Sequence, residues 1–338
     1  MTVVVEMHPD PAILDQLADE WNKLLRRAAF DTIFITPTYQ RLWWRYLQRG
    51  DFCLLAARED GGELLGVAPL FIVEQDGAGR VIQTTGCTDV SDYLDWIVAR
   101  GREQEVLAAL VGFLDGPAAP PWERIDMCNV HRDSPTLRWL PELARTSGWT
   151  TATTVQEVCP VVDLPGDWET YVESLDGKDR RELRRKMRRA AENPDLDWYL
   201  VGPGHDLGTE TEAFLDLMAQ SAPDKAGFLT PAMRAFFAAL IRAAADAGWL
   251  QLSFLEWQGQ KLAAFLNFVY NNRVLVYNSG LDWQAYPKLG AGIILTAYLI
   301  ERAIEEGREA YDFLRGDESY KYSFGGVDVT VHRLQVDR

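Results

Sequence analysis

Residues 264–325 read AFLNFVYNNRVLVYNSGLDWQAYPKLGAGIILTAYLIERAIEEGREAYDFLRGDESYKYSFG. This stretch decides the fold because the hydrophobic pattern changes its period along it. Residues 273–279 are rich in β-branched and aromatic side chains, which predicts a buried strand. Apolar residues then recur at helical spacing from 289 to 306, and Gly307 follows as a suitable C-cap. The stretch therefore predicts a strand, a loop, a long helix and a further strand at 310–314.

The segments around this stretch extend the pattern on both sides. Residues 250–257 and 261–270 predict a hairpin, and 327–336 predict a last strand. Thr230-Pro231 is a good helix start, with Thr as N-cap and Pro at the first helical position. Further upstream we expect helices at 168–175, 178–192 and 210–220, a strand at 197–201 and a long strand at 150–164.

The first half of the chain repeats this order. Thr36-Pro37 predicts a helix start, and residues 52–58 and 64–73 predict a hairpin. Residues 62–71 align without gaps to 259–268, so the two halves suggest a duplication. Hairpins mixed with helices predict a mixed α/β (α+β) sheet and exclude a purely parallel, doubly wound one. With 338 residues, we expect two domains, 1–158 and 159–338.

Composition excludes several classes of function. The net charge of −16 argues against DNA binding, which needs a broad positive surface. No signal peptide is recognisable and no apolar run approaches the ~20 residues of a membrane span, so a cytoplasmic protein is expected. The four cysteines and four histidines are scattered, which predicts reduced thiols and no metal site.

Two glycines in the first turn of the predicted long helix, Gly290 and Gly292, require an explanation because glycine destabilises a helix. Bare backbone N–H groups at a helix start can hold a pyrophosphate. Alternatively, the glycines let the helix pack closely on the sheet.

The segment 311–325 gathers Arg, Lys, three Tyr and three carboxylates at the end of a strand and in the turn after it. Reacting groups often lie on such loops, where a Tyr or a carboxylate can take a proton from an attacking amine. A salt-bridged turn is the alternative.

Residues 178–189, KDRRELRRKMRR, form a basic amphipathic helix in an acidic protein. It could meet tRNA phosphates, the 3′-phosphate of CoA or an anionic membrane surface, or it could be a solvated face paired with acidic neighbours. In the first half, Asp89, Asp92, Tyr93 and Asp95 form a smaller acidic cluster that could bind substrate or simply end a strand.

Taken together, the segment 264–325, the upstream stretches DKAGFLTPAMRAFFAAL and KDRRELRRKMRRA, and the acidic cluster resemble the CelD (BcsL)-type acetyltransferases. These belong to the GNAT superfamily and are close to the FemAB transferases. The resemblance implies two tandem GNAT-like domains and transfer of an acyl group from acyl-CoA, without a metal, to an amine such as an amino sugar or a polysaccharide precursor.

The resemblance also implies site residues. Asp312, Tyr320 and Lys321 would surround the reacting centre. The strand end and the helix start would hold the donor through Tyr277, Asn278, Ser279, Leu289, Gly290, Ala291 and Gly292. Substrate would be bound by Asp92, Tyr93, Arg315, Asp317 and Glu318. The chain departs from the usual pyrophosphate pattern at Pro287 and Lys288, which leaves the strength of CoA binding open.

Two other interpretations remain. A FemAB-like enzyme would use aminoacyl-tRNA as donor, which the basic helix favours and the net charge opposes. A non-catalytic binding module would keep the fold and lose the reaction. The acyl length, the acceptor and the oligomeric state do not follow from the sequence.

Overall fold

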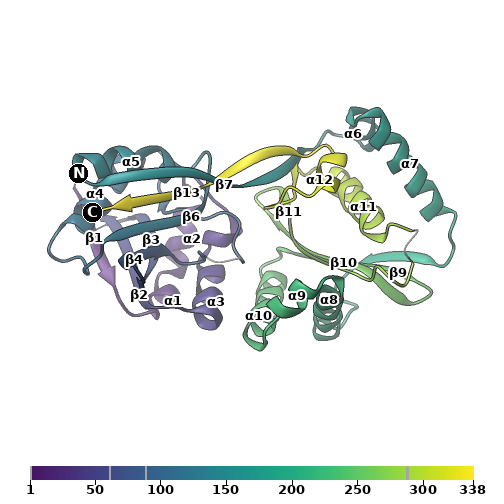
Figure 1. Cartoon of the computed structure of the whole chain (residues 1–338), viewed down its shortest axis with the longest axis horizontal. Helices are drawn as coiled ribbons and strands as arrows, with labels where there is room; N and C mark the ends of the chain where they lie inside the picture. The colour runs from purple at the N-terminus through teal and green to yellow at the C-terminus, as the bar shows by residue number, and fades with distance from the viewer. Residues whose placement is uncertain (1, 61, 88–89, 287–288) are drawn as a thin grey trace. The chain divides into compact units, whose positions relative to one another are not determined.

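The computed structural model describes residues 2–60, 62–87, 90–286 and 289–338. Contacts divide them into two compact units, one formed by residues up to Glu157 with Val329–Arg338 and the other by Val158–Asp328 (Figure 1). The sequence analysis placed the last strand in the second domain. However, β13 (Val327–Asp337) pairs antiparallel with β6 (Arg124–His131), so the end of the chain returns to unit 1.

Unit 1 is a mixed sheet with helices on both faces. Its strands follow the order β1-β2-β3-β4-β6-β13, and the short β5 pairs with β3. Trp43 of α3 packs on Phe71 of β3 on one face, whereas Val106 of α4 approaches Gly66 of the same strand on the other. The further elements of this unit are β1 (Val3–His8), α1 (Ile13–Gln16), α2 (Ala18–Leu25), η1 (Ile33–Ile35), α3 (Pro37–Leu47), β2 (Asp51–Glu59), β3 (Leu64–Gln75), β4 (Gly79–Thr84), β5 (Ile97–Val98), α4 (Glu103–Asp115) and α5 (Pro135–Thr146).

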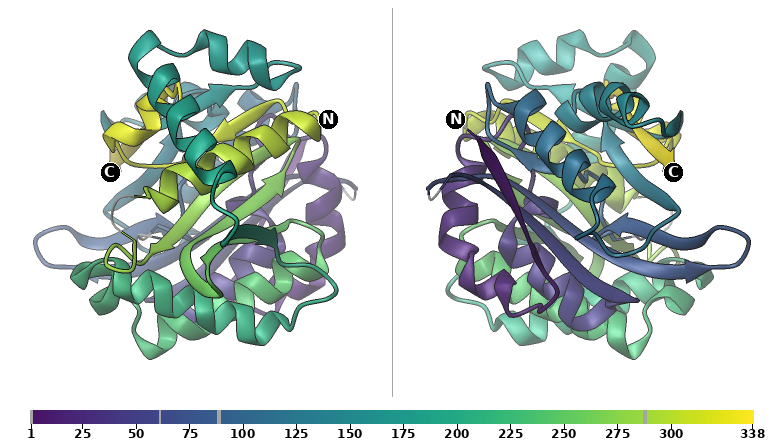
Figure 2. Two further views of the ribbon diagram at one scale, coloured as in Figure 1. Left: turned by 90° about the vertical axis from the view of Figure 1, so that its right-hand side faces the viewer. Right: turned by 90° about the vertical axis from the view of Figure 1, so that its left-hand side faces the viewer.

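Unit 2 repeats this architecture. Its strand order is β8-β9-β10-β11-β12-β7, which matches the order in unit 1 strand for strand. The helices α6, α7 and α11 cover one face, and α8 to α10 cover the other (Figure 2, left view). The elements are β7 (Thr150–Asp163), which begins in unit 1, α6 (Trp168–Ser174), α7 (Gly177–Ala191), β8 (Leu196–Leu200), α8 (Leu207–Ser221), α9 (Pro223–Phe228), α10 (Pro231–Asp246), β9 (Leu250–Trp257), β10 (Gln260–Tyr270), β11 (Arg273–Leu281), α11 (Ala291–Glu305), β12 (Ala310–Asp312) and α12 (Ser319–Ser323).

Local signals explain where several helices begin. The Thr36 hydroxyl accepts a hydrogen bond from the backbone N–H of Tyr39 (3.2 Å), and the Thr230 hydroxyl accepts one from Met233 (3.3 Å). Both predicted N-caps are therefore confirmed. At the other end of α11, Gly307 has a φ of +68° and its N–H donates to Ile304, as the predicted glycine C-cap requires.

The cysteines differ from the expectation. Cys87 and Cys128 form a disulfide in unit 1, although 41 residues separate them in the sequence. Their Cα atoms lie 5.7 Å apart because the fold brings the end of β4 next to β6, a proximity that sequence spacing does not reveal. Cys53 and Cys159 are buried free thiols.

Candidate functional site

The centre of unit 2 is a place where two parallel strands separate. β11 and β12 share three residue pairs, ending at Leu275 and Asp312, whereas β11 continues to Leu281. On its other side, the register with β10 shifts so that Tyr277 forms a bulge between paired residues Val276 and Asn278. Beyond Leu275 the backbone of β11 therefore has no ladder with β12, and its N–H and C=O groups can bind a ligand instead.

The start of α11 lies directly after this strand. Gly290 is the N-cap with a φ of +73°, a conformation that favours glycine. The first N–H groups of a helix have no partner inside it, so this end is a positive, anion-binding pole. Lys186 of α7 adds a cation, because its Nζ lies 2.5 Å from where a Cβ on Gly290 would stand. Basic helix α7 thus reaches the expected pyrophosphate position.

The expected donor-binding side chains have different environments. The ring of Tyr277 is buried between Phe237 and Phe268, with centroids 5.7 and 5.0 Å away, so only its backbone faces the separation of the strands. The Asn278 side chain accepts a hydrogen bond from the backbone N–H of Ser279 (3.2 Å). Leu289 is buried just before Gly290. Ala291 and Gly292 form the first turn of α11. Pro287 and Lys288 lie outside the described residues.

Sequence reasoning missed Lys225, which lies on α9 against the same strand. Its Nζ donates a 2.7 Å hydrogen bond to the backbone carbonyl of Ser279. Burial lowers the pKa of Lys225, and the carboxylates of Glu318 and Asp224 oppose that shift. The signal in the sequence was a single lysine next to the apolar residues AGFL. The sequence alone could not connect this lysine with Ser279, 54 positions further along the chain.

Asp312 and Lys321 hold the loop that follows β12. The Asp312 carboxylate is 2% exposed and accepts from the backbone N–H of Leu314 (2.9 Å), a residue with a φ of +54°. Lys321 Nζ is also buried and donates to the carbonyls of Leu314, Arg315 and Gly316 at 3.3, 2.7 and 3.1 Å. Asp312 and Lys321 were expected at the reacting centre. In the structure, both side chains hold the backbone of the loop through these hydrogen bonds.

Tyr311, which is buried, and Tyr320, which is partly buried, both pack against Phe313 in this region. Burial and then the Glu318 carboxylate raise the pKa of Tyr320, whose ring packs edge-on against Phe313. Burial raises the pKa of Tyr311 as well, with Tyr320 adding to the shift. Both hydroxyls therefore stay protonated over the physiological pH range and can donate a proton.

The acidic end of the loop is open to solvent. Asp317 and Glu318 are exposed, and the Glu318 carboxylate pairs with Lys321 Nζ at 2.9 Å. Arg315 is partly buried in the same loop. The structure thus gathers the expected catalytic residues and three of the expected substrate residues at the end of β12, in the loop after it and in the short helix α12, where a plain turn was expected.

Asp92 and Tyr93 belong to unit 1. Both are buried, and the Tyr93 ring contacts Phe34 and His131 edge-on. The neighbouring Asp95 is fully buried, which raises its pKa to about 7 while Thr136 and Ser134 oppose the shift. Asp89, the first member of the cluster, lies outside the described residues.

Among the described residues of unit 1, the matching helix start differs from the anion-binding start of α11. Its matching helix, α4, begins after Arg102 with Glu103 and Glu105 in the first turn. The Glu103 carboxylate accepts from the backbone N–H of Gly101 (2.9 Å), and Arg102 is paired with Glu105 and Glu59. A phosphate at the start of α4 would meet two carboxylates. The helix start that suits a phosphate is therefore that of α11 in unit 2.

Comparison with known families fits this geometry. Residues 177–322 match the family described as "Acetyltransferase (GNAT) domain". The matched range includes α7, the separating strands, the start of α11 and the loop up to Tyr322. Comparison with curated proteins gives no match.

Solved structures resemble the whole chain. A crystal structure of FemX is 12% identical with a TM-score of 0.67, covering 97% of this chain and 96% of FemX. The structure of L-PGS from Bacillus licheniformis is 12% identical with a TM-score of 0.59, covering 98% and 92%. A tandem GNAT protein from the clavulanic acid biosynthesis pathway is 10% identical with a TM-score of 0.51, covering 98% of both chains. The chain thus has a tandem GNAT-like fold.

Two structural findings bear on partners. Among the described residues, no group of three or more metal-ligating side chains is assembled, and no helix has the length and apolarity needed to cross a bilayer.

In α7, the cations of Arg180, Arg184, Arg185 and Lys186 pair with glutamates. Within the described chain, no such pair involves Lys178, Arg181, Arg188 or Arg189.

Proposed function

We propose that the chain is an N-acyltransferase that moves an acyl group from acyl-CoA to an amine acceptor in unit 2. The observation that carries this proposal is the separation of β11 from β12 beyond Leu275, next to the glycine start of α11. A thioester donor needs an extended edge for its amide-containing arm and a positive pole for its pyrophosphate. Both lie within the matched residues 177–322.

The reaction is a direct transfer. The lone pair of a neutral amine attacks the thioester carbonyl carbon, the C–S bond then breaks, and the amide nitrogen loses one proton while the CoA thiolate gains one. Backbone N–H groups of β11 near the Tyr277 bulge would stabilise the oxyanion. The Tyr320 hydroxyl would donate the proton to the thiolate, because its raised pKa keeps it protonated.

The remaining residues would position the reactants. Asp312 and Lys321 would act through the loop backbone that they hold. Asn278, Ser279 and the start of α11 would bind the donor. On the acceptor side, Arg315, Asp317 and Glu318 would face the amine, with Lys225 beneath the end of β11.

The test is release of free CoA thiol from acetyl-CoA and longer acyl-CoA esters in the presence of a panel of amino sugars and other amines. We expect acceptor-dependent release by the wild type. Tyr320→Phe should reduce it about 100-fold or more, as expected for loss of a general acid. Lys321→Ala should also reduce it, because the loop carbonyls of Arg315 and Gly316 lose their donor. Tyr322→Phe is the matched control, since its hydroxyl bonds exposed Asp328 instead. Unchanged turnover in the first two variants would remove these assignments.

A second candidate is an aminoacyl-tRNA-dependent transferase of the FemAB type. The observation that favours it is the row of exposed cations at Lys178, Arg181, Arg188 and Arg189 in a protein of net charge −16. Consumption of aminoacyl-tRNA, with no thiol release from any CoA ester, would replace the first proposal with this one. A CelD-type role with a polysaccharide precursor as acceptor remains a proposal that rests on the sequence resemblance.

A further inference from the structure

The hydrogen-bond pattern of β11 shows to which side the carbonyl of Ser279 points. The backbone N–H of Asp282 donates to the carbonyl of Leu262 (2.9 Å), so these residues are a hydrogen-bonded pair of the antiparallel β10–β11 ladder. Hydrogen-bonded and non-hydrogen-bonded pairs alternate along such a ladder. Ser279 and Phe265, three pairs further on, are therefore a non-hydrogen-bonded pair. The Ser279 carbonyl thus points away from β10, toward the side where β12 has separated.

Lys225 places a primary amine at this open edge of β11. Its Nζ atom lies 2.7 Å from the Ser279 carbonyl oxygen. The same edge is assigned above to the arm of the acyl-CoA donor. We propose that Lys225 is a site of self-acylation, which takes its acyl group from the bound acyl-CoA when no acceptor amine is present. This inference rests on the proposed function and adds a covalent modification site to it.

The surroundings of Lys225 favour the form of the amine that reacts. Only a neutral amine has a lone pair with which to attack a carbonyl carbon. Burial lowers the pKa of Lys225, and this effect outweighs the carboxylates of Glu318, in the loop after β12, and Asp224, on α9. At a given pH, a larger fraction of Lys225 than of an exposed lysine is therefore neutral.

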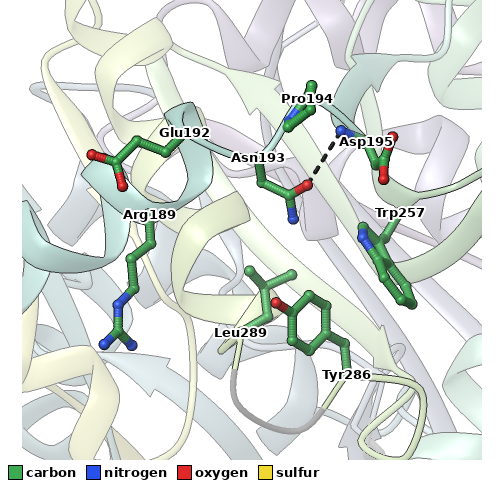
Figure 3. Close-up of a pocket in the computed structure, with 8 residues that line it drawn as sticks. All are labelled: Arg189, Glu192, Asn193, Pro194, Asp195, Trp257, Tyr286 and Leu289. Atoms are coloured by element: carbon green, nitrogen blue, oxygen red, sulfur yellow. Dashed lines mark hydrogen bonds between the residues drawn. The ribbon is translucent and has the colours of Figure 1, made fainter.

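Other cations of unit 2 are less suited to acylation. Lys186, Lys261 and Lys321 each form an ion pair with a glutamate, which favours the charged ammonium form. Within the described part of unit 2, no such ion pair involves Lys225. In the cavity between the end of α7 and β9, the cation is Arg189, whose guanidinium stays protonated and does not act as a nucleophile (Figure 3).

The modification is an acyl transfer in which Lys225 takes the place of the acceptor. The thioester carbonyl is assigned near Tyr277, two residues or about 7 Å along β11 from Ser279, and the flexible stem of a lysine can swing over that distance. The Lys225 ammonium first loses a proton to solvent, and the Nζ lone pair then forms a bond to the carbonyl carbon. The C–S bond breaks, the amide nitrogen loses a second proton and the CoA thiolate gains one. The products are an Nε-acyl-lysine and free CoA thiol.

An acyl group on Lys225 would change the edge of β11 that is assigned to the donor. The nitrogen would lose its positive charge and keep one N–H in place of the three of an ammonium group. The acyl group would also add bulk beside the Ser279 carbonyl. We therefore expect the acylated chain to bind CoA and its esters more weakly, so that the modification limits the enzyme's own turnover.

The test is incubation of the full chain with acetyl-CoA and no acceptor, followed by peptide mapping with mass spectrometry. We expect acetylation of Lys225 to be about tenfold or more faster than that of Lys178, because a bound donor is held beside the amine. Lys178 is the matched control, since it is an exposed lysine of the same unit. An excess of free CoA should slow the reaction at Lys225 and leave that at Lys178 unchanged.

Two further measurements complete the test. Lys225→Arg should remove the fast acetylation from the intact-mass spectrum, because a guanidinium does not take up the acyl group. Calorimetric titration of the acetylated wild type with free CoA should show binding about tenfold weaker than that of the untreated chain. Unchanged affinity in the acetylated chain would overturn the self-limiting role.

The outcomes separate this inference from the proposed function. Binding of acetyl-CoA without acetylation of Lys225 would overturn the modification site and leave the donor assignment intact. Equal rates at Lys225 and Lys178, unaffected by free CoA, would do the same, because they would indicate a chemical reaction in solution. If no CoA ester binds or reacts with any amine, the proposed function fails and the inference fails with it. The comparison of two lysines within the wild-type chain does not depend on the folding of a variant.

Discussion

The Nζ atom of Lys225 lies 2.7 Å from the backbone carbonyl oxygen of Ser279, to which it donates a hydrogen bond. This contact connects α9, on one face of the unit 2 sheet, with β11 just beyond the point where β11 leaves β12. A partly buried lysine therefore holds the strand segment that we assign to the acyl donor. Because removal of this charged hydrogen bond leaves the partly buried Ser279 carbonyl without its partner, the contact has a measurable consequence.

We expect Lys225→Met to reduce kcat by about tenfold or more while the free energy of unfolding falls by about 1–3 kcal/mol. Steady-state thiol release and urea unfolding measure the two effects. Lys178→Met, which removes an exposed lysine of α7, should change neither. A Lys225→Met enzyme with full kcat would show that the segment is held by other contacts.

The pH dependence of activity should also show the role of Lys225. Burial lowers the pKa of Lys225, so its ammonium loses its proton at a lower pH than an exposed lysine. Activity that needs the charged form should therefore decline on the alkaline side before pH reaches the ordinary lysine range of about 10.4. Lys225→Arg should extend this limb to higher pH. An identical limb in both proteins would assign it to another group.

Gly290→Ala tests the anion-binding helix start. The new Cβ would meet Lys186 Nζ at 2.5 Å in a residue with positive φ, so it should displace the cation and weaken CoA binding about tenfold. Gly307→Ala is a matched control at the other end of α11, because Gly307 also has positive φ (+68°) but has no neighbouring atom within 4 Å of the new Cβ. Both variants should lose about 1 kcal/mol of stability, but only Gly290→Ala should bind CoA more weakly. An equal loss of CoA affinity in Gly307→Ala would contradict the assignment of the pyrophosphate to the start of α11.

Gly280→Ala should destabilise unit 2. A Cβ at Gly280 would lie 2.4 Å from the backbone nitrogen of Met218 and 2.6 Å from the carbonyl carbon of Leu217 on α8. Backbone atoms cannot rotate away, so α8 would have to shift, at a cost of about 1–3 kcal/mol. Thermal unfolding measures this cost, and a wild-type midpoint would show that α8 packs less closely than described.

Asp95 should make the stability of the protein depend on pH. Its pKa is about 7 in the folded state because of burial, above the value of about 3.9 in an unfolded chain. The unfolded state therefore ionises first as pH rises from 4 to 7, and stability falls over that window by up to about 4 kcal/mol. Asp95→Asn should flatten the curve and be the more stable protein at pH 8, with the difference vanishing near pH 4. Urea unfolding from pH 4 to 8 measures this, with exposed Asp19→Asn as a control that should follow the wild type.

The predictable part of the fold depended on local signals. Thr36 and Thr230 cap their helices as their sequences indicate, and Gly307 ends α11, because each of these interactions joins residues at most three apart. The partner of the last strand was not predictable. Val331 pairs with His131, 200 residues earlier, and no local pattern distinguishes that partner from a strand of the second half.

In the candidate site, too, some features were visible in the sequence and others depended on the folded structure. The run around Asp312 and Lys321 predicted a candidate loop, since charged side chains concentrated at a strand end are visible in the sequence. Their contacts with loop backbone were not visible, because they depend on where the carbonyls of Leu314 to Gly316 point. Lys186 was hidden among seven other basic residues, and only the packing of α7 on α11 distinguishes it.

Calorimetric titration of the full chain with acetyl-CoA, a long-chain acyl-CoA and free CoA tests the central claim most directly. We expect one binding site per chain, with an ester bound more tightly than free CoA. A single site is expected despite the two similar units because unit 1 has Glu103 and Glu105 where unit 2 has a glycine helix start. Absence of binding to all three compounds would contradict an acyl-CoA donor, and two equal sites per chain would contradict the assignment of the donor site to unit 2.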